Sequence, residues 1–271
     1  MNLDKFLESV VGSSSLDEGR FSYLNASISH IRLIKGKLVR SALIFELGTK
    51  LNIADPLLRV IAQAVEELHL STLVHDDMSC MDNATERRGV PTINAISGDA
   101  VALQSGNWIF ADSIALILGS SVPTESEKVL IITAIVETFK RIANGQVGDK
   151  ALDVNSKLDV YLDVYRDKTS AIFAEVSKLL GLLFSKHDSV LAERLFDAGE
   201  KLGIAFQLAD DISEYNGGEI GEVNIIHAKG IDAALELYRR YLEDSRQLYG
   251  DSQCGVPLIT FDRIEGIVGK N

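Results

Sequence analysis

The placement of proline most strongly constrains how this chain can fold. Proline lacks a backbone N–H and disrupts the interior of a helix or a central strand, but it is tolerated in the first turn of a helix. The prolines all fall between segments in which apolar residues recur every three or four positions, and they are Pro56, Pro91, Pro123 and Pro257. Long stretches therefore remain in which helices can run without interruption.

Helical periodicity fills these stretches. Asp55 has the features of an N-cap and Pro56 those of a first helical residue, after which apolar residues recur at helical spacing as far as Leu73. Similar patterns, separated by segments rich in Gly, Ser and Asn, predict helices at about residues 37–51, 92–119, 124–143, 158–184, 189–214 and 230–248. No strand pattern of convincing length competes with them. We therefore predict an all-α fold, a single domain over residues 1–271 built as one large helical bundle.

Charge and composition restrict the ligands. The formal net charge of −12 argues against broad attraction to nucleic acid or to an anionic membrane, so an anionic ligand would need a local basic pocket or bound cations. Cys80 and Cys254 are too few for a disulfide framework. No segment reaches the roughly 18 uninterrupted apolar residues of a membrane span, and the N-terminus has no signal-peptide pattern. We expect a cytoplasmic protein with no transmembrane segment and no nucleic-acid partner.

A first acidic cluster follows an apolar helix. Asp76, Asp77 and Asp82 lie close together in the sequence, and Arg87 and Arg88 follow shortly after them. On a straight helix Asp76 and Asp82 would point about 240° apart. They could bind one ligand only if the helix ended or bulged near residues 78–81, and we predict such an irregularity.

A second acidic cluster lies on a later helix. Asp210 and Glu214 are four residues apart and share a helix face, with Asp211 beside them. Crowded carboxylates either take up protons or recruit a cation, and oxygen ligands without nearby His or Cys favour magnesium over zinc. An Asp pair on a helix commonly lies on a solvent-exposed face. Apolar residues flank both clusters, however, which places these acids at the rim of a core. Because magnesium also binds phosphate oxygens, the predicted substrate is a di- or triphosphate.

The two clusters and their surroundings resemble the trans-prenyltransferase, or polyprenyl diphosphate synthase, family. The segment from His75 to Thr92 is the most specific match, because a four-residue spacer separates the Asp pair from Asp82 and Arg87-Arg88-Gly89 follows. This spacer is typical of the short-chain branch, which includes geranylgeranyl and farnesyl diphosphate synthases. Further matches occur in the order of the family, and they are Lys35-Gly36-Lys37-Leu38-Val39-Arg40, Glu67-Leu68-His69, Gly145-Gln146, Asp167-Lys168-Thr169 and residues 203–211.

The resemblance implies an isoprenoid synthase fold with a central cavity, a homodimer, and head-to-tail condensation of isopentenyl diphosphate with dimethylallyl, geranyl or farnesyl diphosphate. The implied ligands of a cluster of Mg²⁺ ions are Asp76, Asp77, Asp82, Asp210, Asp211 and Glu214. The residues implied for the allylic diphosphate are Arg87, Lys168, Thr169 and Gln207, and those for isopentenyl diphosphate are Lys37, Arg40, His69 and Arg88. The catalytic residues would be Asp76, Asp77, Lys168, Asp210 and Asp211.

The chemistry agrees with this division of residues. Ionisation of an allylic C–O bond puts negative charge on the leaving diphosphate, so metal ions and guanidinium groups directed at it stabilise the transition state more than the ground state. Apolar helix faces would keep water away from the carbocation and leave the double bond of isopentenyl diphosphate as the nearest nucleophile. No protein nucleophile is required.

Product length is expected to depend on the helix that carries Asp76. Ser71 and Thr72 lie about one turn before Asp76 and are expected to line the tunnel for the growing chain. In the family, a bulky aromatic residue near these positions stops growth at farnesyl diphosphate, whereas small residues permit further addition. The resemblance therefore favours geranylgeranyl diphosphate as the product, with farnesyl diphosphate as the shorter possibility.

Some positions depart from the family pattern. Ser213 and Glu214 replace an aliphatic residue and Asp, Asn107 stands where Asp is expected, and residues 221–224 lack the usual lysine, for which Lys229 is a candidate substitute. Two alternatives therefore stay open: a non-catalytic subunit of a heteromeric prenyltransferase, and a terpene cyclase on the same fold. The residues implied for isopentenyl diphosphate count against a cyclase, which has no need of that site.

Overall fold

The computed structural model describes residues 2–10, 22–32, 36–185, 189–215, 223–252 and 254–269. These residues are almost entirely helical, which confirms the predicted all-α class. They form two compact units. Unit 1 comprises residues 1–41 and 55–135, and unit 2 comprises residues 42–54 and 136–271.

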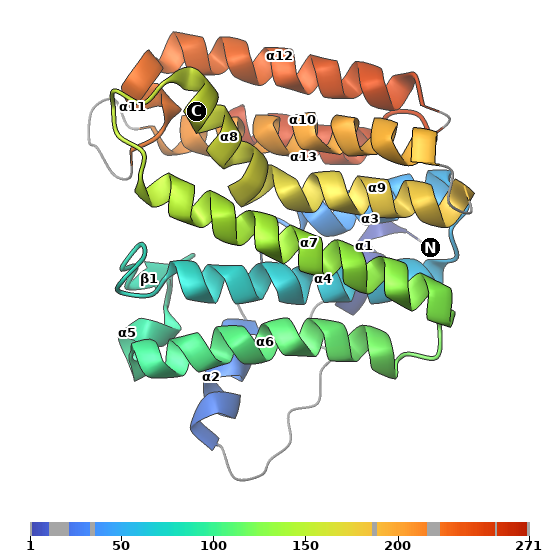
Figure 1. The fold of residues 1–271 in the computed structure, drawn as a ribbon, viewed down its shortest axis with the longest axis horizontal. Coiled ribbons are helices and arrows are strands. Elements are labelled where there is room, and N and C mark those ends of the chain that lie inside the picture. The colour runs from blue at the N-terminus through green and yellow to red at the C-terminus, as the bar shows by residue number, and fades with distance from the viewer. Residues whose placement is uncertain are drawn as a thin grey trace. The chain divides into compact units, whose positions relative to one another are not determined.

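Unit 1 is built around the helix that begins at the Asp55-Pro56 pair. Its elements are α1 (Leu3–Val10), α2 (Ser22–Arg32), α4 (Asp55–Asp76), β1 (Glu86–Arg87), β2 (Val90–Pro91), α5 (Ile93–Ser97) and α6 (Asp99–Gly119). Helix α6 packs along α4, and α2 contacts α6 (Figure 1). At Gly106 of α6 an added Cβ would lie 2.3 Å from Nε2 of His75 on α4, so any side chain at this position would displace the His75 ring. The apolar core includes Ile28, Ile31, Val74, Ile93, Ala102 and Ile109.

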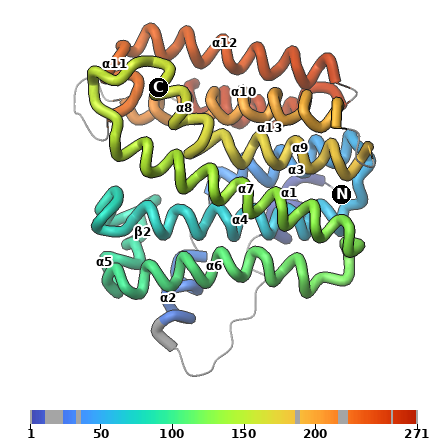
Figure 2. Tube along the Cα trace, viewed as in Figure 1, coloured from blue at the N-terminus to red at the C-terminus, as the bar shows by residue number. Residues whose placement is uncertain are grey.

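The chain after α4 differs in two ways from the sequence prediction. The helix predicted over residues 92–119 is divided into α5 and α6, because Gly98 adopts a φ of 80° between them. Strands β1 and β2 form an antiparallel hairpin of only two residues each, too short to be recognised from alternation (Figure 2). The two turn residues, Arg88 and Gly89, both have positive φ, as a tight hairpin turn requires.

Unit 2 contains the second half of the chain and part of an earlier helix. Its elements are most of α3 (Val39–Lys50), the C-terminal part of α7 (Glu125–Lys150), α8 (Leu158–Tyr165), the π-helix η1 (Arg166–Ser170), α9 (Ala171–Ser185), α10 (Ser189–Glu214), α11 (Ile225–Lys229), α12 (Ile231–Gly250) and α13 (Leu258–Val268). Helix α10 packs against both α9 and α12 (Figure 1). The helix predicted over 158–184 is therefore interrupted by a π-helical turn.

Aromatic side chains and one buried carboxylate hold unit 2 together. The rings of Phe173 and Phe206 join α9 to α10 with centroids 5.4 Å apart. The Tyr249 hydroxyl lies 2.7 Å from the Ser177 hydroxyl, which links α12 to α9. The Glu46 carboxylate of α3 accepts hydrogen bonds from the backbone N–H groups of Ile259 and Thr260 in the first turn of α13, as a side chain that caps a helix N-terminus does.

Candidate functional site

The first acidic cluster lies where α4 ends. Helix α4 stops at Asp76, and the chain turns back so that the backbone N–H of Asp82 donates to the carbonyl of Asp76 over 2.9 Å. The predicted irregularity near residues 78–81 is confirmed. It returns Asp82 to the helix end that carries Asp76, which a straight helix would not do.

Asp77 is held by a guanidinium. The Nε and Nη2 atoms of Arg87 both donate to Oδ1 of Asp77, over 2.9 Å and 2.7 Å, and only 2% of the Asp77 side chain is exposed. Burial raises the pKa of the Asp77 carboxyl, while the hydrogen bonds and charge of Arg87 oppose that rise. A fork of this kind fixes both partners in direction. Arg87, in strand β1, therefore orients Asp77.

Positive charge gathers around His69 of α4. Burial, followed by the charges of Arg40, Arg88 and Arg87, holds the pKa of His69 well below its ordinary 6.5. The imidazole is consequently neutral near pH 7, and it offers one N–H donor and one acceptor nitrogen. Three of the residues predicted for isopentenyl diphosphate, Arg40, His69 and Arg88, thus lie together in unit 1.

The segment before α3 joins the same group. An added Cβ at Gly36 would lie 2.8 Å from Nη1 of Arg88, so the backbone next to Lys37 passes directly beside that guanidinium. Leu38 and Arg88 have φ of 49° and 55°, in the left-handed region that side chains other than glycine seldom adopt and that recurs at functional sites. Lys35, the residue that replaces a family glycine, lies outside the described residues.

The second acidic cluster lies in unit 2, where Asp211 is part of a chain of hydrogen bonds. Asp211 of α10 is buried and accepts a hydrogen bond from Nε2 of Gln207 over 2.8 Å and another from the Tyr165 hydroxyl. Thr169 of η1 donates to Oε1 of Gln207 over 2.5 Å. Burial raises the pKa of Asp211 to about 7, although both of its hydrogen bonds oppose this. Three predicted residues, Thr169, Gln207 and Asp211, therefore belong to one network.

The carboxylates suit magnesium that arrives with a phosphate ligand. In the described parts of the chain no three His, Cys, Asp or Glu side chains lie close enough together to form a metal site by themselves. Mg²⁺ is usually bound by one or two carboxylates together with substrate phosphate oxygens and water, rather than by an all-protein cage. Within unit 1, Asp76 and Asp82 are partly exposed, and within unit 2, Asp210 is partly exposed and Glu214 is exposed, so each acidic cluster offers oxygen donors of the kind that Mg²⁺ prefers.

Lys168 has an acidic partner that sequence reasoning missed. Its Nζ atom lies 2.6 Å from Oδ2 of Asp149 on α7. The signal for Asp149 was its place one turn after Gly145, next to the Gly145-Gln146 motif. Tyr165, the other missed residue, has no local pattern, because its hydrogen bond to Asp211 spans 46 positions.

The remaining candidate positions have local partners. Asn107 is hydrogen-bonded to His75, which precedes Asp76. Lys229, the candidate substitute for the missing lysine, donates to the carbonyl of Ser156 over 3.4 Å. Gly221 and Glu222 of that region lie outside the described residues.

The predicted tunnel residues are both buried. The Ser71 hydroxyl donates to the carbonyl of Leu68 over 2.7 Å, and the Thr72 hydroxyl donates to the carbonyl of His69 over 2.8 Å. Both hydroxyls therefore bond within α4, and each position presents only a small side chain to its surroundings.

Comparison with known proteins decides the family. A sequence model described as polyprenyl synthetase matches residues 21–221. The chain belongs to the polyprenyl synthetase family. It is 30% identical over 202 residues to a prenyl transferase of Synechocystis sp., covering 72% of this chain and 59% of that protein, and 27% identical over 233 residues to the farnesyl diphosphate synthase of Escherichia coli, covering 79% and 78%. This family member spans about three fifths of the length of the first curated relatives that it matches.

Solved structures agree on the fold of this polyprenyl synthetase family member. The geranyltransferase of Helicobacter pylori, complexed with magnesium and isoprenyl diphosphate, matches with a TM-score of 0.84 at 20% sequence identity. The match covers 98% of this chain and 94% of that one. The fold is therefore of the predicted isoprenoid synthase type.

Proposed function

We propose that this polyprenyl synthetase family member is a magnesium-dependent prenyltransferase that condenses isopentenyl diphosphate head to tail with an allylic diphosphate. The observation that carries the proposal is the group of cations around neutral His69, close in the chain to the carboxylates at the end of α4. Like charges gathered in this way repel one another, and a diphosphate would offset that repulsion. The chain as a whole has a net charge of −12 and does not attract anions in general, so this group of cations marks a specific anion site.

Isopentenyl diphosphate is assigned to the cations of unit 1. Arg40 and Arg88 supply guanidinium forks that can bind phosphate oxygens in pairs, and Lys37 adds a further charge. His69 contributes a hydrogen bond without a charge, because its lowered pKa keeps the ring neutral. The substrate would be held by its diphosphate, which leaves its double bond available as the nucleophile.

The allylic diphosphate is assigned to Lys168, Thr169, Gln207 and Arg87. Bound Mg²⁺ would neutralise the charge that develops on the leaving diphosphate. Its proposed ligands are the six carboxylates Asp76, Asp77, Asp82, Asp210, Asp211 and Glu214. Asp77 and Asp211 already accept hydrogen bonds from Arg87 and from Gln207 and Tyr165, so these bonds would have to be shared or exchanged on metal binding.

Geranylgeranyl diphosphate is the proposed product. The buried, small Ser71 and Thr72 support it, because neither offers a ring that would stop chain growth at farnesyl diphosphate. Farnesyl diphosphate is the alternative product, because the chain is also 27% identical to the farnesyl diphosphate synthase of Escherichia coli.

A homodimer in the cytoplasm completes the proposal. Among the described helices, α6 is the one long and apolar enough to pass a compositional test for a membrane span, and one third of its most apolar window is buried. Leu103 and Leu118 of α6 are 42% and 56% exposed. We assign this apolar surface to a second copy of the chain, a state that sedimentation equilibrium can measure.

Product analysis separates this function from its two alternatives. The purified chain is incubated with Mg²⁺, isopentenyl diphosphate and labelled farnesyl diphosphate. A labelled product one five-carbon unit longer supports the proposed prenyltransferase. Release of diphosphate with a cyclised hydrocarbon would identify a terpene cyclase instead. No turnover until another subunit is added would identify a non-catalytic subunit.

A further inference from the structure

The π-helix η1 carries Lys168 and Thr169 and interrupts the helix that runs from α8 into α9. Turns of this kind are rare in proteins overall, and many of those that occur lie at functional sites. The flanking residues Tyr165 and Ala171 keep right-handed helical backbone angles, and η1 contains neither glycine nor proline. Its winding therefore has no local explanation, and contacts from other helices must hold it.

Two helices of unit 2 pack their backbone directly against η1. An added Cβ at Gly145 of α7 would lie 2.1 Å from the backbone nitrogen of Lys168. An added Cβ at Gly203 of α10 would lie 2.4 Å from Cα of Ser170. The Ser170 hydroxyl also donates to the carbonyl of Glu200 on α10 over 2.5 Å. Helices α7 and α10 thus both restrict how η1 can wind.

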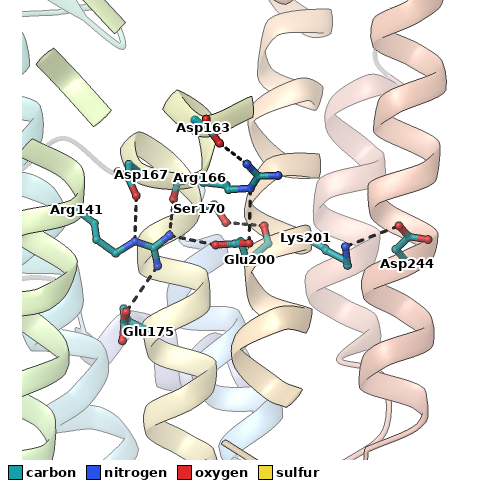
Figure 3. A network of polar contacts seen from close by, with 9 residues as sticks. All are labelled: Arg141, Asp163, Arg166, Asp167, Ser170, Glu175, Glu200, Lys201 and Asp244. Atoms are coloured by element: carbon teal, nitrogen blue, oxygen red, sulfur yellow. Dashed lines mark hydrogen bonds and ion pairs between the residues drawn. The ribbon is translucent and has the colours of Figure 1, made fainter. Parts of the chain in front are cut away.

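Arg141 adds polar contacts at the start of η1. It lies one turn before Gly145 on α7, so both residues share the helix face that meets η1. Its Nη2 donates to the main-chain carbonyl of Arg166 over 3.1 Å, and its Nε donates to Oδ1 of Asp167 over 3.2 Å (Figure 3). A side chain from another helix therefore bonds the backbone of Arg166 and the side chain of Asp167, the two residues before Lys168.

The same guanidinium also forms ion pairs with carboxylates on α9 and α10. It lies 3.2 Å from Glu200 of α10 and 3.6 Å from Glu175 of α9 (Figure 3). The Phe196 ring covers it at 5.3 Å, and the Arg141 side chain is 20% exposed. Because a guanidinium donates in fixed directions, these contacts set α7, η1, α9 and α10 in one arrangement.

We propose that Arg141 is a positioning residue for the allylic diphosphate, acting through the winding of η1. The proposal rests on the diphosphate-binding role proposed above for Lys168 and Thr169. While η1 keeps its π form, Lys168 stays beside Asp149 and Thr169 beside Gln207. Rewinding to the α form would shift the helix register by one residue, about 100° of rotation, and would turn both side chains away from these partners.

A double-mutant cycle tests whether Arg141 acts through Lys168. Binding of inorganic pyrophosphate with Mg²⁺ is measured by isothermal titration calorimetry for the wild type, Arg141→Gln, Lys168→Ala and the double variant. Arg141→Gln should weaken binding about tenfold, but only about twofold when Lys168 is already absent, because the two residues serve one contact. Equal weakening in both backgrounds would overturn the proposal.

Two further variants separate positioning from general stability. Lys201 of α10 pairs with Asp244 of α12 at 3.9 Å in the same region, so Lys201→Ala removes an ion pair that serves a different contact (Figure 3). It should leave pyrophosphate binding unchanged. Arg141→Lys keeps the charge but not the fork, and it should give an intermediate affinity. If Lys201→Ala weakens binding as much as Arg141→Gln, the positioning role is wrong.

Turnover distinguishes this inference from the proposed function. A wild type that binds pyrophosphate in an Arg141-dependent way but never elongates a prenyl chain would support the inference and contradict the function. A wild type that elongates, with Arg141→Gln changing neither pyrophosphate binding nor the KM for the allylic substrate, would contradict the inference alone.

Discussion

Arg87 and Asp77 show how single side chains are held before any ligand arrives. A carboxylate that is 98% buried stays in place because two donors of one guanidinium lie within 2.9 Å of it. Lys168 and Asp149 form a similar pair in unit 2, at 2.6 Å. Side chains oriented in this way lose little freedom when a diphosphate binds, so their hydrogen bonds contribute more to binding.

The two proposed diphosphate sites predict different kinetic losses. Arg88→Ala should raise the KM for isopentenyl diphosphate about tenfold or more while leaving that for the allylic substrate nearly unchanged, because one charged hydrogen bond is worth about 1.5–3 kcal/mol. Lys168→Ala should show the reverse pattern. Steady-state kinetics with each substrate varied in turn measures both. Equal losses for both substrates in both variants would mean that the division is wrong.

His69 gives the molecule a pH dependence of stability with a definite sign. Its pKa is lowered in the folded state, so the unfolded chain binds more protons at His69 below pH 6.5. The stability contributed by this neutral ring is present above pH 6.5 and is lost as the pH falls towards the folded pKa. Replacing His69 with Gln should reduce the slope of unfolding free energy against pH, between pH 5 and 6.5, by up to about 1.4 kcal/mol per pH unit.

Urea unfolding at a series of pH values measures this slope. If the wild type and His69→Gln lose stability in parallel on acidification, His69 is not held neutral by its surroundings.

At the scale of elements, helix α7 meets η1 through Gly145. Alanine in a helix interior is normally more stable than glycine by up to about 1 kcal/mol. Gly145→Ala should instead destabilise by about 1–3 kcal/mol, because its Cβ would lie 2.1 Å from the backbone nitrogen of Lys168. Gly266 of α13 meets no atom within 4 Å, so Gly266→Ala should be neutral or stabilising. Equal stability of the two variants, measured by urea unfolding, would contradict this packing.

The elements that the sequence predicted are those with local causes. Proline positions and helical periodicity predicted α3, α4, α10 and α12 closely, whereas the helix predicted over 124–143 continues to Lys150 as α7. The need to bring Asp82 back to Asp76 predicted the end of α4. Gly98 was an available signal for the division of the 92–119 helix, although a single glycine does not always break a helix.

The features that the sequence did not predict depend on residues far apart in the chain. The winding of η1 involves Arg141, Gly145 and Gly203, which lie on two other helices. The β1–β2 hairpin has too few residues to show a strand pattern. For the candidate site, the Asp–Lys and Tyr–Asp pairs of unit 2 become visible only once α7, α8 and α10 are packed.

At the scale of the whole molecule, product length is the property most open to change. Ser71 is buried on α4 and presents a small side chain, so a tyrosine there would occupy the space proposed for the last five-carbon unit. Ser71→Tyr should shift the main product from geranylgeranyl to farnesyl diphosphate, as measured by chromatography of labelled products. An unchanged product would place the stop on another helix.

The most direct measurement follows the transfer of label from isopentenyl diphosphate to a longer prenyl diphosphate, with Mg²⁺ and with excess chelator. The account predicts elongation with Mg²⁺, loss of elongation in chelator, and recovery when Mg²⁺ is restored. It also predicts a rate about a thousandfold lower for Asp76→Ala, since a carboxylate that helps to hold the metal contributes several kcal/mol to the transition state. Full elongation in excess chelator, or no elongation under any of these conditions, would contradict the account.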